Sequence, residues 1–249
     1  MKTKNNSGFA RTRKKSVPAS KGSYVKPTAL LNARGLRSRE RLKEAARVVL
    51  NEKGYHSLRV QDITERAGVA NGLFYRYFHD LREIVAEICS DFFDRLVGAG
   101  GTLEVGDEPY DWIYQNHRDV VERFARNPGV LAVLFGLAGD YEEFASIWQR
   151  NAHDWNLQVA EFLQSSAGFE RSHAERMGFV LGAMIEGVIY QALIRHTDDL
   201  FEFGGKPEDI AEISAVMWYR TIFLDNPPLD LLRETGKHLA GESLAKKNI

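Results

Sequence analysis

The segment between residues 57 and 79 holds polar side chains at a spacing that suits contact with nucleic acid. Apolar residues at helical spacing predict two short helices, joined by the turn AGVA, in which Gly68 can take a left-handed backbone without a Cβ penalty. The second helix would then turn outward a set of amide, phenol, guanidinium and small groups: Asn71, Gly72, Leu73, Tyr75, Arg76 and Tyr77. Such groups favour contact with base edges and phosphates in a major groove. A small helical hairpin with a polar outer face is the alternative.

Positive charge is concentrated at the start of the chain. The first 47 residues contain 14 Lys or Arg and 2 Glu, a net charge of +12, so the other 202 residues carry −13. This division favours contact between the basic end and a polyanion, although a solubilising tail without a partner would have the same composition. Residues 1–36 are also rich in Ser, Gly and Asn, and we predict that they form a disordered basic arm.

The elements that must position these side chains are helices, because period-two alternation is not sustained anywhere and helical spacing recurs. We predict an all-α chain with a first helix capped by Ser38 and ended by Gly54, and a connection at the glycines of 98–101. The other expected helices span 60–67, a short segment to 78, 80–96, 110–126, 128–137, 141–165, 172–195, 207–224 and 229–240.

Composition and motifs exclude several classes of protein. The single cysteine, Cys89, excludes an intramolecular disulfide framework and fits a reducing cytoplasm, and apolar runs fall short of the roughly 20 residues of a membrane helix. Hydrolase, zinc-protease, Walker and dinucleotide motifs are missing from the sequence. We therefore expect a cytoplasmic protein that has no enzymatic activity, cofactor, metal or membrane contact. Cys89 would be a small core residue or, less simply, a redox-sensitive thiol.

The stretch GYHSLRVQDITERAGVANGLFYRYFHDLREI resembles the TetR family of bacterial transcriptional regulators in its Gly-aromatic pair, its "I-x-x-x-A-G-V" helix and turn, and its "G-x-x-Y-x-Y-F" segment. The resemblance covers about 50 residues, from Arg39 through Glu87. It implies an N-terminal three-helix helix-turn-helix DNA-binding domain, with its linking helix, at 37–97. It also implies a larger helical ligand-binding and dimerisation domain at 98–249, and a homodimer on a near-palindromic operator of double-stranded DNA.

Several positions depart from the family's usual residues. Leu58 and Arg59 replace a Ser or Thr cap, Ala70 replaces a Ser, Leu73 a Thr and Leu81 a Lys. Fewer groups are then directed at phosphates, and a basic arm lying in the minor groove could replace them. Weak or relaxed DNA specificity is a further possibility. The predicted DNA-binding residues are Arg59, Gln61, Ala70, Asn71, Gly72, Leu73, Tyr75, Arg76, Tyr77 and Arg82, with Arg11, Arg13, Lys14 and Lys15 of the arm.

The C-terminal region is rich in aromatic residues, most of which would be core. From the resemblance we expect a cavity between its helices for a small hydrophobic or amphipathic ligand. Its predicted lining combines aromatic, Met and interrupting polar side chains: Trp112, Asn116, His117, Phe135, Trp148, Asn151, Trp155, Met177, Met184 and Glu186. Glu186 interrupts the apolar run GAMIEGVIY. It would bind a cationic or hydroxyl-bearing ligand if it faces the cavity, and pair or meet water if it faces a dimer seam.

Small residues at a spacing of four on the helix 172–195 allow another helix to approach closely. We predict a dimer interface that includes Gly178, Gly182, Gly187, Ile213 and Met217, with close packing inside one subunit as the alternative. The favoured function is a ligand-released repressor. The alternatives are a dimeric DNA-binding regulator, even an activator, without small-molecule control, and an enzyme or carrier with an incidental helix-turn-helix.

Overall fold

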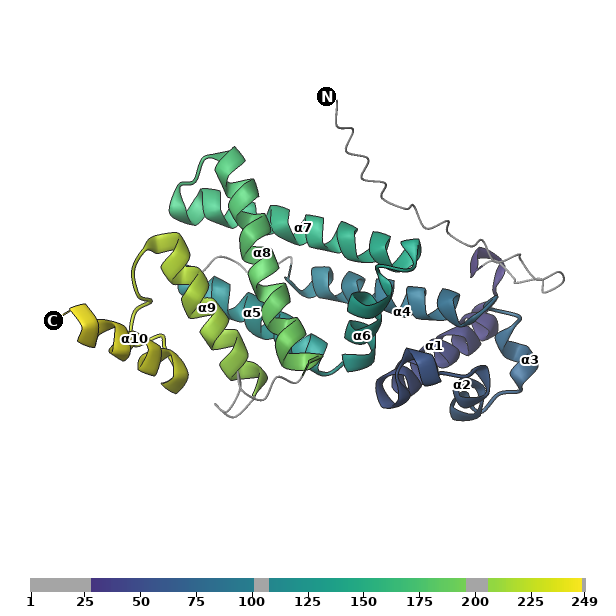
Figure 1. Cartoon of the computed structure of the whole chain (residues 1–249). Coiled ribbons are helices and arrows are strands. Elements are labelled where there is room, and N and C mark those ends of the chain that lie inside the picture. The colour runs from purple at the N-terminus through teal and green to yellow at the C-terminus, as the bar shows by residue number, and fades with distance from the viewer. Residues whose placement is uncertain (1–27, 101–107, 196–205, 248–249) are drawn as a thin grey trace, which may run out of the picture.

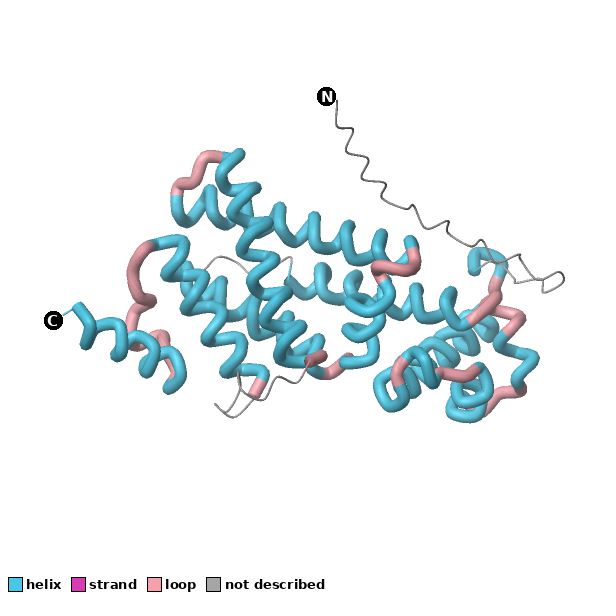
Figure 2. The backbone as a smooth tube through the Cα atoms, in the orientation of Figure 1, coloured by secondary structure: helices cyan, strands magenta, loops and turns pink. Residues whose placement is uncertain are grey.

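The computed structural model describes residues 28–100, 108–195 and 206–247, and within these ranges the chain forms helices without strands, as the all-α prediction requires (Figure 2). The first domain contains α1 (Ala33–Lys53), α2 (Val60–Ala67), α3 (Asn71–Phe74) and the start of α4 (Leu81–Gly100). The remaining helices are α5 (Pro109–Ala125), α6 (Pro128–Leu137), α7 (Glu142–Ala167), α8 (Arg171–Leu193), α9 (Pro207–Phe223) and α10 (Glu234–Lys247). No helix in the described ranges is long and apolar enough to cross a bilayer.

Local signals explain where several helices begin and end. Gly54, at φ 71°, ends α1, and Gly68, in the left-handed region at φ 62° and ψ 44°, ends α2, both as predicted. The cap of α1 is a correction: Oδ1 of Asn32 accepts a hydrogen bond from the Gly35 amide at 2.9 Å, so the helix begins before Ser38. The Ser38 hydroxyl instead donates to the Arg34 carbonyl, one turn back inside the helix.

Two further boundaries differ from the expectation. Helix α4 continues through Gly98 to Gly100, so most of the expected glycine connection is helical. Helix α10 begins at Glu234, later than the expected start near residue 229. The end of the predicted disordered arm is a correction: Thr28–Leu30 form a short 3-10 helix, and residues 33–36 lie in the first turn of α1. Residues 1–27 of the arm lie outside the described residues.

The first domain is held together by apolar side chains whose spacing predicted their burial. Leu42 of α1, Ile63 of α2 and Phe74 of α3 are fully buried, and Phe78 packs against Phe74 with ring centroids 5.6 Å apart. Ion pairs between Lys53 and Asp62 and between Arg66 and Glu52 add to the contact of α1 with α2. The result is a compact support for the turn and for α3.

The larger domain is built from pairs of packed helices, α5 against α9 and α7 against α8 (Figure 1). Figure 1 shows α1–α3 at one end of the molecule and α10 at the other, with α4 running from the first domain into the second. Helix α6 also contacts α1: the Gly129 amide donates to Oδ1 of Asn51 at 2.9 Å, and Nη1 of Arg47 donates to Oδ1 of Asn127 at 3.1 Å. Two helices, α4 and α6, therefore connect the domains.

Candidate DNA interface and ligand cavity

The turn between α2 and α3 is fixed by its backbone and by one buried side chain. The Val69 amide donates to the Thr64 carbonyl at 3.0 Å, and the Gly68 amide donates to the Glu65 carbonyl at 3.0 Å. Thr64 is fully buried, and its hydroxyl forms a hydrogen bond with the side-chain amide of Asn71 across the turn. The position of α3 relative to α2 is thus set at its first residue.

Most of the side chains predicted to face DNA from α3 are exposed. Asn71, Gly72 and Arg76 are exposed, Tyr75 is 45% exposed, and Leu73 is half-buried. Tyr77 is a correction: it is 3% exposed, because the chain leaves α3 after Phe74 and turns this ring into the core. The Arg76 guanidinium lies 6.0 Å from the Tyr77 ring centroid, so Tyr77 supports a neighbouring cation and does not itself project outward.

The predicted contacts beside α3 have different environments. Arg59 and Gln61, at the start of α2, are both exposed, and Gln61 donates to Glu65 at 2.7 Å. Ala70 precedes α3 in the extended conformation of an N-cap, at φ −70° and ψ 144°, but has no side-chain oxygen with which to cap it. Arg82 is half-buried, lies 3.7 Å from Glu143 of α7 and packs over the Tyr141 ring, so it joins α4 to the larger domain. Arg11, Arg13, Lys14 and Lys15 lie outside the described residues.

Buried charges connect α1 to α4. Arg39 and Lys43 are only 7% and 8% exposed, and they pair with Glu87 and Asp91, respectively, on α4. Arg39 also lies 4.6 Å from the centroid of the Phe78 ring. Removing one partner of such a buried pair leaves a desolvated charge, which is strongly destabilising. The first half of α4 is therefore held to the DNA-facing domain, a relationship that helical spacing alone did not predict.

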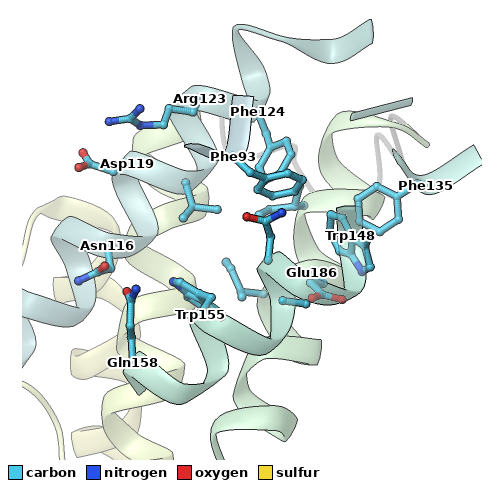
Figure 3. Close-up of a pocket in the computed structure, with 15 residues that line it drawn as sticks. Phe93, Asn116, Asp119, Arg123, Phe124, Phe135, Trp148, Trp155, Gln158 and Glu186 are labelled. Atoms are coloured by element: carbon cyan, nitrogen blue, oxygen red, sulfur yellow. The ribbon is translucent and has the colours of Figure 1, made fainter. Parts of the chain in front are cut away.

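A cavity of about 90 Å³ lies between the helices of the larger domain (Figure 3). Of the ten residues predicted to line it, six do so: Asn116, Phe135, Trp148, Asn151, Trp155 and Glu186. Its other lining residues are Phe93, Asp119, Val120, Arg123, Phe124, Ala152, Gln158, Ile185 and Ile189. Positions 116, 119, 120, 123 and 124 share one face of α5 by their spacing, and this periodicity could have identified them once Asn116 was chosen.

Four predicted ligand residues lie elsewhere. Trp112 stacks on Phe162, with centroids 4.1 Å apart and an interplanar angle of 6°. His117 is completely buried, edge-on to Trp218, and desolvation lowers its pKa to about 3 against a smaller opposing effect of the Ala211 backbone. Met184 is 38% exposed and Met177 borders a separate surface depression. Residue type alone therefore did not distinguish the aromatic and Met side chains that line the cavity from those in the core or on the surface.

The polar groups of the cavity differ in how they are satisfied. Nδ2 of Asn116 donates to the Trp112 carbonyl at 2.8 Å, and Nδ2 of Asn151 donates to the Ile147 carbonyl at 2.7 Å, so each amide leaves its oxygen as an acceptor. Glu186 makes no hydrogen bond or ion pair with a residue that the structure describes, and burial raises the pKa of its carboxyl. Of the two orientations left open by the sequence, the structure has Glu186 lining the cavity (Figure 3).

The glycines of α8 correct part of the predicted dimer interface. A Cβ at Gly178 would lie 2.8 Å from the Asn156 carbonyl oxygen, and one at Gly182 would collide with the Asn156 side chain. Both glycines are buried against α7 of the same subunit. Gly187 and Met217 are exposed and Ile213 is half-buried, so these three positions remain available to a second subunit.

Cys89 lies on α4 and is fully buried. Desolvation raises the pKa of its thiol to about 12, so the reactive thiolate is scarcely populated near neutral pH. Of the two roles considered from the sequence, the structure supports the small core residue.

Residues 42–88 match the model of the bacterial regulatory proteins of the tetR family. A helix-turn-helix transcriptional regulator of Bacillus subtilis, YdgC, is 35% identical over 66 residues, which are 26% of this chain and 34% of YdgC. A second B. subtilis regulator, YxaF, is 21% identical over 163 residues, 63% of this chain and 85% of YxaF. The chain thus spans about a third of YdgC and most of YxaF.

Solved structures share the fold of this chain over most of its length. A transcriptional regulator from Rhodococcus superposes with a TM-score of 0.62 at 22% identity, covering 74% of this chain and 97% of that one. A TetR regulator from Haloarcula marismortui also gives 0.62, at 17% identity, over 76% of this chain and 98% of that one. A regulator from Saccharomonospora viridis, solved in complex with choline, superposes with a TM-score of 0.57 at 18% identity, covering 75% of this chain and 96% of that one. Residues 42–88 therefore match the DNA-binding region of the TetR family of bacterial transcriptional regulators, as the resemblance in the sequence predicted, and the chain shares the fold of solved regulators of this kind.

Proposed function

We propose that the protein is a cytoplasmic repressor that binds a near-palindromic operator as a homodimer and is released when a small molecule occupies the cavity. The observation that carries ligand control is the position of Phe93: it lines the cavity on α4, two residues after Asp91, which pairs with Lys43 of the DNA-facing domain. Because one helix borders the cavity and is held to α1, a ligand that displaces Phe93 changes the orientation of α3.

Contact with DNA would be made by α3 and by the start of α2. Asn71, Tyr75 and Arg76 are exposed there and supply amide, phenol and guanidinium groups for one major groove. In a two-fold dimer the two copies of α3 would meet successive major grooves about 34 Å apart. Release then requires only that the ligand-bound dimer holds them at another separation.

The homodimer would use the outer face of α8 and α9. Large apolar side chains are exposed on it, Phe179 by 67%, Met184 by 38% and Met217 by 44%. Exposed apolar groups clustered on two helices favour burial by a partner, and a two-fold contact buries the same patch on both subunits. Ile213 and Gly187 border these residues by helical spacing, which supports their predicted place in the interface.

A small-molecule effector is supported by the mixed aromatic and polar lining of the cavity and by the choline complex of the regulator from S. viridis. The alternative, a dimeric regulator or activator without a ligand, is favoured by the small cavity volume of about 90 Å³. The two functions differ in one outcome, which is whether any ligand that fills the cavity changes affinity for DNA.

Binding to a DNA fragment spanning the protein's own promoter, followed by fluorescence anisotropy, tests the proposal. We expect promoter preference over an unrelated duplex, and a loss of about tenfold or more in Arg76→Ala, since one good contact to DNA is worth about 1–3 kcal/mol. Arg126→Ala, at an exposed arginine that follows the last residue of α5, is the matched control and should bind normally. Equal affinity for both duplexes, or an Arg76→Ala variant that binds the promoter as tightly as the wild type, would contradict the assigned interface.

A further inference from the structure

We propose that the cavity binds a small organic cation of the alkylated ammonium type, with the Glu186 carboxylate as counter-ion and aromatic rings as the walls around the cation. This inference deepens the proposed ligand control and rests on it for its regulatory meaning, whereas binding itself can be measured without DNA.

The first observation is the aromatic wall. Phe135 and Trp148 lie with ring centroids 4.8 Å apart, and Phe93 lies 6.0 Å from Trp148 and 6.3 Å from Phe124. These rings come from four different helices and border one cavity (Figure 3). Aromatic faces carry partial negative charge, and several of them around one space favour a cation whose charge is spread over methyl or methylene groups.

The second observation is the carboxylate of Glu186. Its neighbours Ile185 and Ile189, on the same face of α8, are only 2% and 3% exposed, and all three line the cavity. Glu186 itself is half-buried, and this partial loss of hydration is costly for a carboxylate unless it is paired. The described residues supply neither a hydrogen bond nor a cation. Burial accordingly raises the pKa of Glu186. A bound cation would supply the missing partner.

The other charged side chains of the cavity do not supply this partner. Asp119 and Arg123 are one helical turn apart on α5, and Figure 3 shows both on the opposite side of the cavity from Glu186, close to each other. Arg123 has an interaction of its own with the protein. The aromatic end of the cavity, formed by Phe135 and Trp148 beside Glu186, is thus the end with an uncompensated negative charge.

The remaining polar groups and the volume narrow the ligand class. The side-chain oxygens of Asn116 and Asn151 are acceptors, so a hydroxyl or ammonium donor on the ligand would be satisfied there. A volume of about 90 Å³ suits a compact cation such as a trimethylammonium group better than a long-chain or polycyclic one.

The test compares cations with a neutral molecule of the same shape. Isothermal titration calorimetry of the full chain would use tetramethylammonium, choline and benzyltrimethylammonium, together with dimethylbutanol, in which carbon replaces the quaternary nitrogen of choline. We expect at least one of the cations to bind. We also expect choline to bind about tenfold or more tightly than dimethylbutanol, because only the cation gains the ring and carboxylate interactions.

Two variants assign that preference to residues. Glu186→Gln should weaken binding of the preferred cation by about tenfold and leave dimethylbutanol unaffected, while Glu175→Gln, exposed on the same helix, should bind the cation normally. Phe135→Leu should weaken the cation more than the neutral analogue, since it removes a ring and keeps an apolar side chain. Thermal unfolding checks folding, and Glu186→Gln should be no less stable than the wild type, because it removes a half-buried carboxylate that has no partner among the described residues.

The outcomes separate this inference from the proposed function. Failure of all three cations to bind, equal affinity for the charged and neutral analogues, or an unaffected Glu186→Gln variant overturns the cation site. Cation binding that leaves promoter affinity unchanged supports the cation site and contradicts ligand control. Release of DNA by a neutral compound, with no binding of any cation, supports ligand control and contradicts the cation site.

Discussion

The backbone of Gly129, at the start of α6, lies so close to the Leu50 carbonyl oxygen of α1 that a Cβ atom at residue 129 would stand 2.5 Å from it. The Gly129 amide also donates to the side chain of Asn51 in the same turn of α1. Backbone thus meets backbone at the joint between the two domains. Because Phe135 lies farther along α6 and lines the cavity, this joint is a second connection between the ligand site and the DNA-facing domain.

Substitution Gly129→Ala should open this joint. The added methyl group cannot be accommodated unless α6 moves away from α1, and overpacking of this kind costs about 1–3 kcal/mol in the free energy of unfolding. Urea denaturation would measure this decrease. Gly136→Ala, on the same helix with open space around its Cβ position, is the control and should be neutral or stabilising by up to about 1 kcal/mol. A Gly129→Ala variant as stable as the wild type would mean that the close approach of α6 to α1 is not maintained in solution.

Substitution Ala70→Ser should supply the cap that α3 lacks. Residue 70 already has the backbone conformation of an N-cap, so a hydroxyl there would accept from an amide in the first turn and stabilise the protein by about 1 kcal/mol, or about 2–4 °C in Tm. Calorimetry would measure the shift, with Ala132→Ser at an exposed position inside α6 as the control, where serine should be slightly destabilising. Equal effects at the two sites would contradict the capping explanation. Fluorescence anisotropy with the promoter fragment would show whether the same hydroxyl also raises the affinity of the protein for DNA.

Removal of residues 1–27 should weaken DNA binding and reduce its dependence on salt. The segment contains Arg11, Arg13, Lys14 and Lys15, and the slope of log K against log salt falls by about 0.9 for each phosphate that is no longer neutralised. The comparison is a salt series with the full chain and the truncated chain on the same duplex. An unchanged slope would show that the basic segment does not bind the phosphates.

Acid should destabilise the protein through His117. Its pKa in the folded protein is about 3, against an ordinary value of 6.5, so between these values the unfolded chain binds a proton that the folded one does not. The free energy of unfolding is therefore unaffected by this residue above pH 6.5 and falls as pH drops below it, by about 2 kcal/mol at pH 5. Urea denaturation at pH 7.5 and pH 5 should show a smaller difference for His117→Leu than for the wild type. His153→Gln, at an exposed histidine of α7, is the control and should show the same difference in the free energy of unfolding between the two pH values as the wild type. A smaller difference in this control would mean that His117 is not the group responsible.

The fold was predictable where its determinants are local. Gly68 and Pro128 mark the end of α2 and the start of α6, and both helices have the predicted bounds. The cap of α1 was missed because Asn32 and Ser38 are both good N-cap residues, and the spacing of apolar residues did not indicate that Leu31, next to Asn32, packs against the core. Spacing identified part of the cavity, but Phe93 comes from α4, and only the tertiary arrangement brings it to α5 and α7.

The small residues of α8 predicted that another helix packs closely against it, but they did not indicate which helix. The strip containing Gly178 and Gly182 predicted a close helix approach, which the structure confirms, but the approaching helix is α7 of the same subunit. Tyr77 likewise lies one turn after residues that face outward, and its burial follows from the end of α3 at Phe74, which the pattern of aromatic residues did not indicate.

Cys89 makes the junction of the domains observable without any added label. It is the only thiol in the chain and is fully buried on α4, so an alkylating reagent can reach it only when its surroundings open. The rate of alkylation under native conditions therefore reports how often the surroundings of Cys89 open. Comparing this rate with and without operator DNA would show whether binding to DNA restrains α4.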